Sequence, residues 1–214
     1  MQPSRIRRSI AIAVLVVGCG GQQAHAPAQP QVAKKRLVVV GDSLAFGRFA
    51  GTQAEAFPQR VAAALQARPE VLAAPGVTTA QIAAQDVPGG ADVVVVEAGT
   101  NDFLYQTPRR RFAADYRALL AKVTAASPNA RRVCLTTWVP PDVPPAKIPA
   151  SFYDATIRRA CTGGAVADLS AISAQPGMRG PEGRSTAFGP GDAFHPNSAG
   201  HAAIARLIEA RERG

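Results

Sequence analysis

Residues 36–44 read RLVVVGDSL, a run of apolar, β-branched residues that ends in a small polar turn. A short run of this composition, bounded by Gly and Asp, predicts a strand that is buried on both faces. Four more strand-length apolar runs follow along the chain, at residues 70–73, 92–97, 132–136 and 165–168, after the first one at 36–40. The sequence therefore predicts five strands.

Amphipathic segments separate these strands. Apolar side chains recur at helical spacing in residues 53–67, 80–85, 108–126, 152–160 and 198–211. We expect Thr107 to cap the third of these helices, with Pro108 at its first position, and Asn197 or Ser198 to cap the last one. Alternation of strand and helix predicts an α/β domain with a five-stranded parallel sheet between two layers of helices.

The N-terminus of the 214-residue chain has the pattern of an export signal. In residues 1–18, a basic start is followed by a short apolar stretch and then by small residues, and the stretch is too short to span a membrane. The segment Val16-Val17-Gly18-Cys19 resembles the lipobox of bacterial lipoproteins, which implies cleavage before Cys19 and lipidation of its thiol. The alternative is an ordinary cleavage within residues 24–28, with an incidental cysteine.

Residues 19–35 are mostly Gln, Ala, Pro and Gly without apolar periodicity, as expected of a flexible linker between an anchor and a domain over residues 36–214. This organisation predicts an exported protein of the cell envelope, lipid-anchored on the periplasmic face or the cell surface, or otherwise secreted. If Cys19 is acylated, Cys134 and Cys161 remain as a pair that can form a disulfide in an oxidising compartment. Two buried free thiols are the alternative.

The formal net charge of +9 raises the question of a nucleic-acid partner. The basic residues are scattered in small groups, and no basic stripe alternates with aromatic residues as binding of a single strand requires. We therefore expect no nucleic-acid partner, a membrane contact only through the lipid anchor, and a monomer.

Four polar segments follow predicted strands or precede the last helix: residues 41–44, 74–79, 99–102 and 192–196. In a parallel sheet, the loops beyond the carboxyl ends of the strands lie along one edge, where ligands bind. We expect these segments to meet there and to form one site.

Their side chains suit acyl transfer. A serine hydroxyl needs a base to take its proton, and among the three histidines only His195 falls in a predicted loop at that edge. Asp192, three residues earlier, can orient the imidazole and stabilise its charged form. The backbone N–H groups of Ser43 and Gly76 and the side-chain amide of Asn101 are the expected oxyanion donors.

In their order and spacing, the segments Gly41-Asp42-Ser43-Leu44, Gly76, 99–102 and 192–195 resemble the four blocks of the SGNH, or GDSL, hydrolase superfamily. The resemblance covers about residues 36–210 and implies a flavodoxin-like, three-layer α/β/α sandwich. By position, it implies a nucleophile at Ser43, oxyanion donors at Gly76 and Asn101, and an acid and base at Asp192 and His195. It implies no metal and no organic cofactor. The second block departs from the family pattern, because Pro75 precedes the glycine and the usual asparagine is missing.

The expected function is that of an exported carboxylesterase that forms an acyl-enzyme and removes small acyl groups, such as acetyl, from carbohydrate or related envelope substrates. The alternatives are a lysophospholipase or thioesterase of the same fold and a non-catalytic envelope-binding module. The elbow of α/β-hydrolases is missing, since Ala45 replaces its second glycine, and the phosphate-binding glycine loops are missing too. Residues 140–149 and 176–191, rich in Pro and Gly, are expected to shape the substrate pocket.

Overall fold

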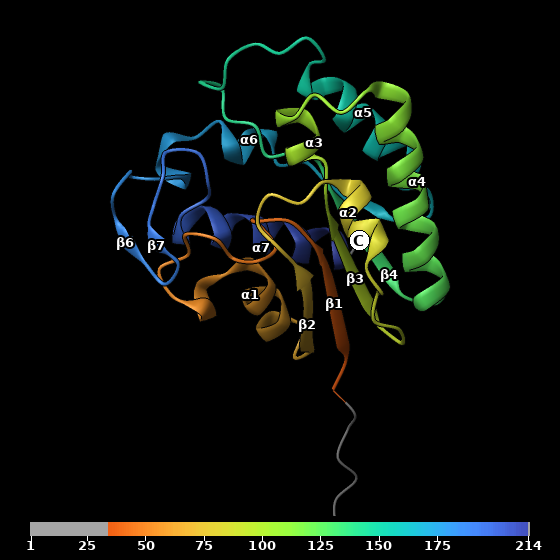
Figure 1. Ribbon diagram of the computed structural model, residues 1–214. Helices are drawn as coiled ribbons and strands as arrows, with labels where there is room; N and C mark the ends of the chain where they lie inside the picture. The colour runs from red at the N-terminus through yellow and green to blue at the C-terminus, as the bar shows by residue number, and fades with distance from the viewer. Residues whose placement is uncertain (1–33, 214) are drawn as a thin grey trace, which may run out of the picture. The chain divides into compact units, whose positions relative to one another are not determined.

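A computed structural model describes residues 34–213, which form one compact unit (Figure 1). The predicted signal peptide (residues 1–18), the lipidation site Cys19 and most of the linker (19–35) lie outside the described residues. Among the residues it describes, no helix has both the length and the apolar character needed to cross a bilayer.

A parallel sheet of five strands forms the centre of the domain and confirms the predicted fold class. Its order is β2-β1-β3-β4-β5, the flavodoxin-like order, with β1 at Arg36–Gly41, β2 at Arg68–Ala73, β3 at Val93–Glu97, β4 at Arg131–Leu135 and β5 at Ala165–Ala167. Strand β1 pairs with both β2 and β3, so that Val39 lies between Val71 and Val95. Pro69, which has no N–H group to donate to a ladder, lies in the edge strand β2.

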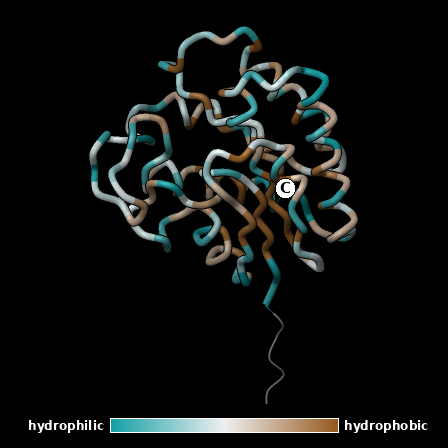
Figure 2. The backbone as a smooth tube through the Cα atoms, in the orientation of Figure 1, coloured by the Kyte–Doolittle hydropathy of each residue, from teal (hydrophilic) through white to brown (hydrophobic). Residues whose placement is uncertain are grey.

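Helices cover both faces of the sheet (Figure 1). One face packs against α1 (Phe57–Ala64) and α7 (Ser198–Arg213), and the other against α2 (Thr79–Ala84), α4 (Arg109–Ala126) and α5 (Ala150–Ala160). Alternate residues of β1 enter the two cores: Leu37 and Val39 face α1 and α7, whereas Val38 and Val40 face the other layer. Figure 2 accordingly shows the strands as the most hydrophobic part of the chain.

The helix predicted over residues 53–67 is the main error in the secondary structure. It is divided into a 3-10 turn, η1 (Gln53–Glu55), and α1, because Ala56 between them is extended. Pro58 explains the division, since proline has no N–H to donate and therefore fits only the first turn of a helix. Helix α1 also ends early, at Ala64, and Gln66 follows with a φ of 52°.

The cap predicted for the helix after residue 107 is wrong by one position. Pro108 itself is the N-cap, with extended backbone, and α4 begins at Arg109. The cap of the last helix is confirmed, because Asn197 Oδ1 accepts the N–H groups of Ala199 and Gly200.

Several short elements were not predicted. They are α3 (Thr100–Leu104), α6 (Ser170–Ser173), η2 (Pro176–Met178) and the two-residue strands β6 (Ser185–Thr186) and β7 (Gly189–Pro190). Cys134 in β4 and Cys161 at the end of α5 are joined by a disulfide.

Candidate active site

Ser43 lies in a tight turn at the carboxyl end of β1. The N–H of Arg48 donates to the Ser43 carbonyl at 2.9 Å, and the N–H of Phe46 donates to the Asp42 carbonyl at 2.9 Å. The turn is packed closely against the next strand, since a Cβ atom placed on Gly41 would lie 2.7 Å from a carboxyl oxygen of Glu97 and 2.6 Å from Ala45 Cβ. Only glycine fits at position 41 without a shift of the backbone or of these neighbours.

His195 contacts Ser43 across 152 positions of the sequence. Its Nε2 lies 3.0 Å from Ser43 Oγ, and its Nδ1 lies 2.7 Å from Asp192 Oδ2. Because the Asp192 carboxylate can only accept a hydrogen bond, Nδ1 carries the proton and Nε2 is free to accept one from Ser43. The structure thus brings the predicted nucleophile, base and acid into one hydrogen-bonded chain.

Asp192 also fixes the backbone of the turn that carries the imidazole. Its second oxygen, Oδ1, accepts the N–H of Phe194 at 3.0 Å and that of His195 at 2.7 Å. The spacing of three residues between acid and base is therefore set by a local turn.

The imidazole of His195 lies against the rings of Phe49 and Phe194, with ring centroids 5.2 Å away in both cases. Burial lowers the pKa of His195 below its ordinary value of 6.5, the neighbouring Asp192 opposes this shift, and Arg48 adds to it. The net lowering keeps the imidazole neutral at neutral pH, which is the form that can accept the serine proton.

The expected oxyanion donors lie on three adjacent segments. Within the part of the chain that the structure describes, we find no acceptor for the N–H of Ser43 or of Gly76. Gly76 has a φ of +81°, a conformation that glycine adopts without strain, so the unusual proline before it is accommodated. The loop of Gly76 is held at Thr79, whose N–H and hydroxyl both donate to Asp102, at 2.8 and 2.7 Å.

Asn101, on α3, lies beside the loops of Ser43 and Gly76, but its side-chain amide already makes two hydrogen bonds. Nδ2 donates to Asp42 Oδ2 and to the Val77 carbonyl, each at 3.0 Å. Donation to an oxyanion therefore requires Asn101 to share or exchange one of these two hydrogen bonds when an ester binds. In the structure without substrate, the amide ties the nucleophile turn to the loop of Gly76.

Two residues behind the site support the His195 turn. Trp138, which follows β4, is fully buried, and its indole Nε1 donates to the Phe194 carbonyl at 2.8 Å. It packs under the loop and does not line an open pocket. Arg179 connects the same turn to the Pro-rich segment, because its Nη1 donates to Asp142 at 2.8 Å and to the Ala193 carbonyl at 3.1 Å. In the sequence, Trp138 is marked only by its position just after a predicted strand, and Arg179 only by its position in the Gly-rich segment 176–191.

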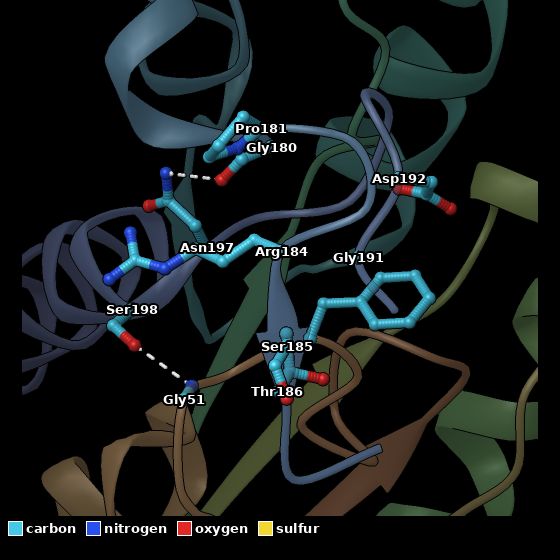
Figure 3. A pocket seen from close by; sticks show the side chains of 11 residues that line it. Gly51, Gly180, Pro181, Arg184, Ser185, Thr186, Gly191, Asp192, Asn197 and Ser198 are labelled. Carbon is cyan, nitrogen blue, oxygen red and sulfur yellow. Dashed lines mark hydrogen bonds between the residues drawn. The ribbon is translucent and has the colours of Figure 1, made fainter. Parts of the chain in front are cut away.

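Small hollows flank the turn that carries Asp192 and His195. One of them, lined by Gly180, Pro181 and Arg184 with Asp192 at its edge, has a volume of about 20 Å³ (Figure 3). Hydrogen bonds from Asn197 to the Gly180 carbonyl and from Gly51 to Ser198 close its walls. A second hollow of about 200 Å³ lies between Asp142–Pro144 and Ala193–Phe194. Within residues 34–213, no cluster of His, Cys, Asp and Glu is arranged to hold a metal ion.

Comparison with known protein families gives a match over most of the chain. The model of the GDSL-like lipase/acylhydrolase family matches residues 39–203. No curated protein matches the sequence significantly.

Solved structures give several matches of the fold. A carbohydrate esterase family 2 enzyme with a carbohydrate-binding domain, from Corynascus thermopiles (Myceliophthora fergusii), has a TM-score of 0.62 and 18% identity over 87% of this chain and 68% of that one. A psychrotrophic esterase from Pseudoalteromonas has a TM-score of 0.61 and 17% identity over 84% and 97% of the two chains. A phospholipase A1 from Streptomyces albidoflavus has a TM-score of 0.59 and 16% identity over 84% and 100%. At these identities, the three matches establish the fold.

Proposed function

Because the chain belongs to the GDSL-like lipase/acylhydrolase family and is an ester-bond hydrolase, we propose that it cleaves carboxylic esters through an acyl intermediate on Ser43. The observation that carries this proposal is the chain of contacts from Ser43 Oγ through His195 to Asp192, at 3.0 and 2.7 Å. A nucleophile, a base and an orienting carboxylate in this geometry are what acyl transfer needs.

In the proposed reaction, Ser43 Oγ attacks the ester carbonyl carbon while its proton passes to His195 Nε2. The negative charge that develops on the carbonyl oxygen is stabilised by the N–H groups of Ser43 and Gly76, with Asn101 as third donor. The imidazolium then protonates the leaving alcohol as the C–O bond breaks. A water molecule, deprotonated by the same imidazole, hydrolyses the acyl-enzyme, releases the carboxylic acid and restores the Ser43 hydroxyl.

We propose a small acyl group, such as acetyl, on a carbohydrate or related envelope molecule as the substrate. The hollows of about 20 and 200 Å³ beside the His195 turn are lined by neither Ser43 nor His195, so this proposal rests on the fold and on the export-like N-terminus. The fold shared with a family 2 carbohydrate esterase is compatible with such a substrate.

The test is hydrolysis of nitrophenyl esters from acetyl to palmitoyl, with acetylated polysaccharides alongside. We expect the rate to fall as the acyl chain lengthens; a rate that rises toward palmitoyl would show a lysophospholipase or long-chain thioesterase instead. Ser43→Ala should abolish hydrolysis and labelling by a fluorophosphonate, whereas Ser151→Ala, at an exposed serine of α5, should change neither. Labelling of the Ser43→Ala protein, or no hydrolysis and no labelling of the unmodified protein, would refute the mechanism.

We also propose export and lipid anchoring at Cys19, based on the basic start, the apolar stretch and the Val-Val-Gly-Cys segment of residues 16–19. Cells that express the full chain should incorporate a fatty-acid label and retain the protein in the membrane fraction. Cys19→Ala should remove the label and release the protein from the membrane fraction. If the unmodified protein and Cys19→Ala are both unlabelled and soluble, an ordinary signal peptide is favoured. Light scattering of the released form tests the proposed monomer.

A further inference from the structure

Glu97 is the last residue of β3, and its carboxyl group is enclosed beneath the nucleophile turn, with 1% of the residue exposed. Its Oε2 accepts the N–H of Asp42 at 2.8 Å and that of Ala45 at 3.3 Å. These two N–H groups flank Ser43, so the conformation of the nucleophile turn depends on one side chain of the neighbouring strand. The close approach at Gly41 has the same origin, because a Cβ there would meet this carboxyl oxygen.

Asp42 is the partner of Glu97 and is fully buried. Its Oδ1 accepts the N–H of Leu44 at 3.1 Å and lies 3.3 Å from Ser43 Oγ, and its Oδ2 accepts the amide of Asn101 at 3.0 Å. The carboxyl groups of Asp42 and Glu97 lie close enough to share a proton, and this contact lowers the pKa of Asp42. Together these contacts connect the end of β3, the nucleophile turn and the oxyanion residue of α3.

Two carboxylates in one dry space cannot both carry a charge at low cost, so the pair retains a proton. Burial raises the pKa of Glu97 well above its ordinary value, and the charge of Asp42 raises it further. Burial also raises the pKa of Asp42, to about 6, and the charge of Asp102 on α3 adds to this rise. Glu97 is therefore the neutral member of the pair and donates to Asp42.

We infer that Glu97 is a positioning residue for ester hydrolysis: as a neutral carboxylic acid, it holds the Ser43 turn by two backbone N–H groups and orients Asp42 toward Asn101. It touches no reacting atom and acts only through these neighbours. The inference rests on the proposed function of Ser43. Its consequence is that loss of the Glu97 carboxyl displaces the nucleophile while the substrate-binding surface stays in place.

Glu97→Gln and Glu97→Leu separate positioning from packing. Glutamine presents an oxygen to the two N–H groups and an N–H to Asp42, as the neutral acid does, whereas leucine fills the space and offers neither. We expect Glu97→Leu to lower kcat for acetyl esters by about 10²-fold, the usual cost of a small misplacement of reacting groups, with KM within about threefold of the unmodified value. Glu97→Gln should restore kcat to within about threefold.

Asp154→Asn is the matched control, because Asp154 is a half-buried carboxylate of α5 that accepts the N–H and hydroxyl of Thr137 and lies outside the proposed machinery. It should leave kcat unchanged.

If Glu97→Leu does not fold, Glu97→Asp replaces it, and its shorter carboxyl should give a lower kcat than Glu97→Gln. The inference is overturned if folded Glu97→Leu or Glu97→Asp retains full kcat, or if Glu97→Gln is as slow as they are. The unmodified protein and Ser43→Ala are labelled with a fluorophosphonate in parallel. Labelling that depends on Ser43 supports the proposed hydrolase function, whatever the Glu97 variants do. The test of that function is therefore independent of the test of Glu97.

Discussion

Replacement of Asp192 by asparagine tests the orienting role of the carboxylate while leaving its turn intact. Oδ1 accepts the two backbone N–H groups of Phe194 and His195, and an asparagine oxygen can keep both hydrogen bonds. The amide NH₂ then takes the place of Oδ2, 2.7 Å from His195 Nδ1, and can only donate to it. The imidazole proton is forced onto Nε2, where it faces Ser43 and prevents the ring from acting as a base.

The expected loss in kcat is about 10⁴-fold, as for the same change in serine proteases, or about 5.4 kcal/mol of transition-state stabilisation. Asp192→Ala is the comparison variant. It removes both backbone hydrogen bonds, at roughly 1 kcal/mol each, and should lower the free energy of unfolding by about 2 kcal/mol, whereas Asp192→Asn should change it by less than about 1 kcal/mol.

The assay combines turnover of a short nitrophenyl ester with urea unfolding of the three proteins. Loss of the Asp192 charge also removes the influence that raises the pKa of His195, so the acidic limb of the pH profile of any residual activity should move to lower pH. An Asp192→Asn protein that keeps more than about a tenth of its kcat would refute the assignment, because a wrongly protonated imidazole cannot supply that rate.

Three further outcomes follow from the same structure. Reduction of the Cys134–Cys161 disulfide, which closes a loop of 27 residues, should cost about 3.5 kcal/mol and lower Tm by about 7–14 °C; an unchanged melting curve with both thiols titrated as free would contradict this. Arg48→Gln removes a positive charge that lowers the pKa of His195, so the acidic limb of kcat/KM should move to higher pH, and a shift to lower pH would show that Arg48 acts otherwise. Asn101→Ala should lower kcat by about 10²- to 10³-fold with little change in KM, measured on the same ester; an unchanged kcat would remove Asn101 from the oxyanion site.

The sequence predicted the five strands and the polar turns because their signals are local. A run such as that of β3, in which all five residues are buried, can be recognised without knowledge of its neighbours. The proximity of Ser43 and His195 followed from one further rule, that the carboxyl ends of parallel strands share an edge. The order of the strands is not local, and the resemblance to a known family was needed to predict it.

The parts that sequence reasoning missed have signals that are short or depend on distant residues. Helix α3 has five residues, too few to show a helical period, and β6 and β7 have two each. Glu97 looks like an ordinary polar residue at the end of a strand. Its importance appears only when Asp42, 55 positions earlier, donates its N–H to that side chain. The division of the helix at Ala56 did have a local signal, Pro58, which helical periodicity outweighed.

The two turns that carry Ser43 and His195 are held differently from the Pro-rich loop of residues 140–149, which the sequence predicts to shape the substrate pocket. Ser43 and His195 lie on short turns held by buried contacts, from Glu97 and from Trp138. The Pro-rich loop carries Asp142, which is exposed. If the loop shapes the pocket as predicted, most substitutions in it should alter the choice of acyl or alcohol group and leave the contacts of Ser43, His195 and Asp192 in place. Arg179 is the exception, since its Nη1 donates to Asp142 and also to the carbonyl of Ala193, two positions before the catalytic base. A change in the loop that draws Arg179 away should therefore reach the His195 turn directly, and we expect it to alter the rate of hydrolysis as well as the choice of substrate.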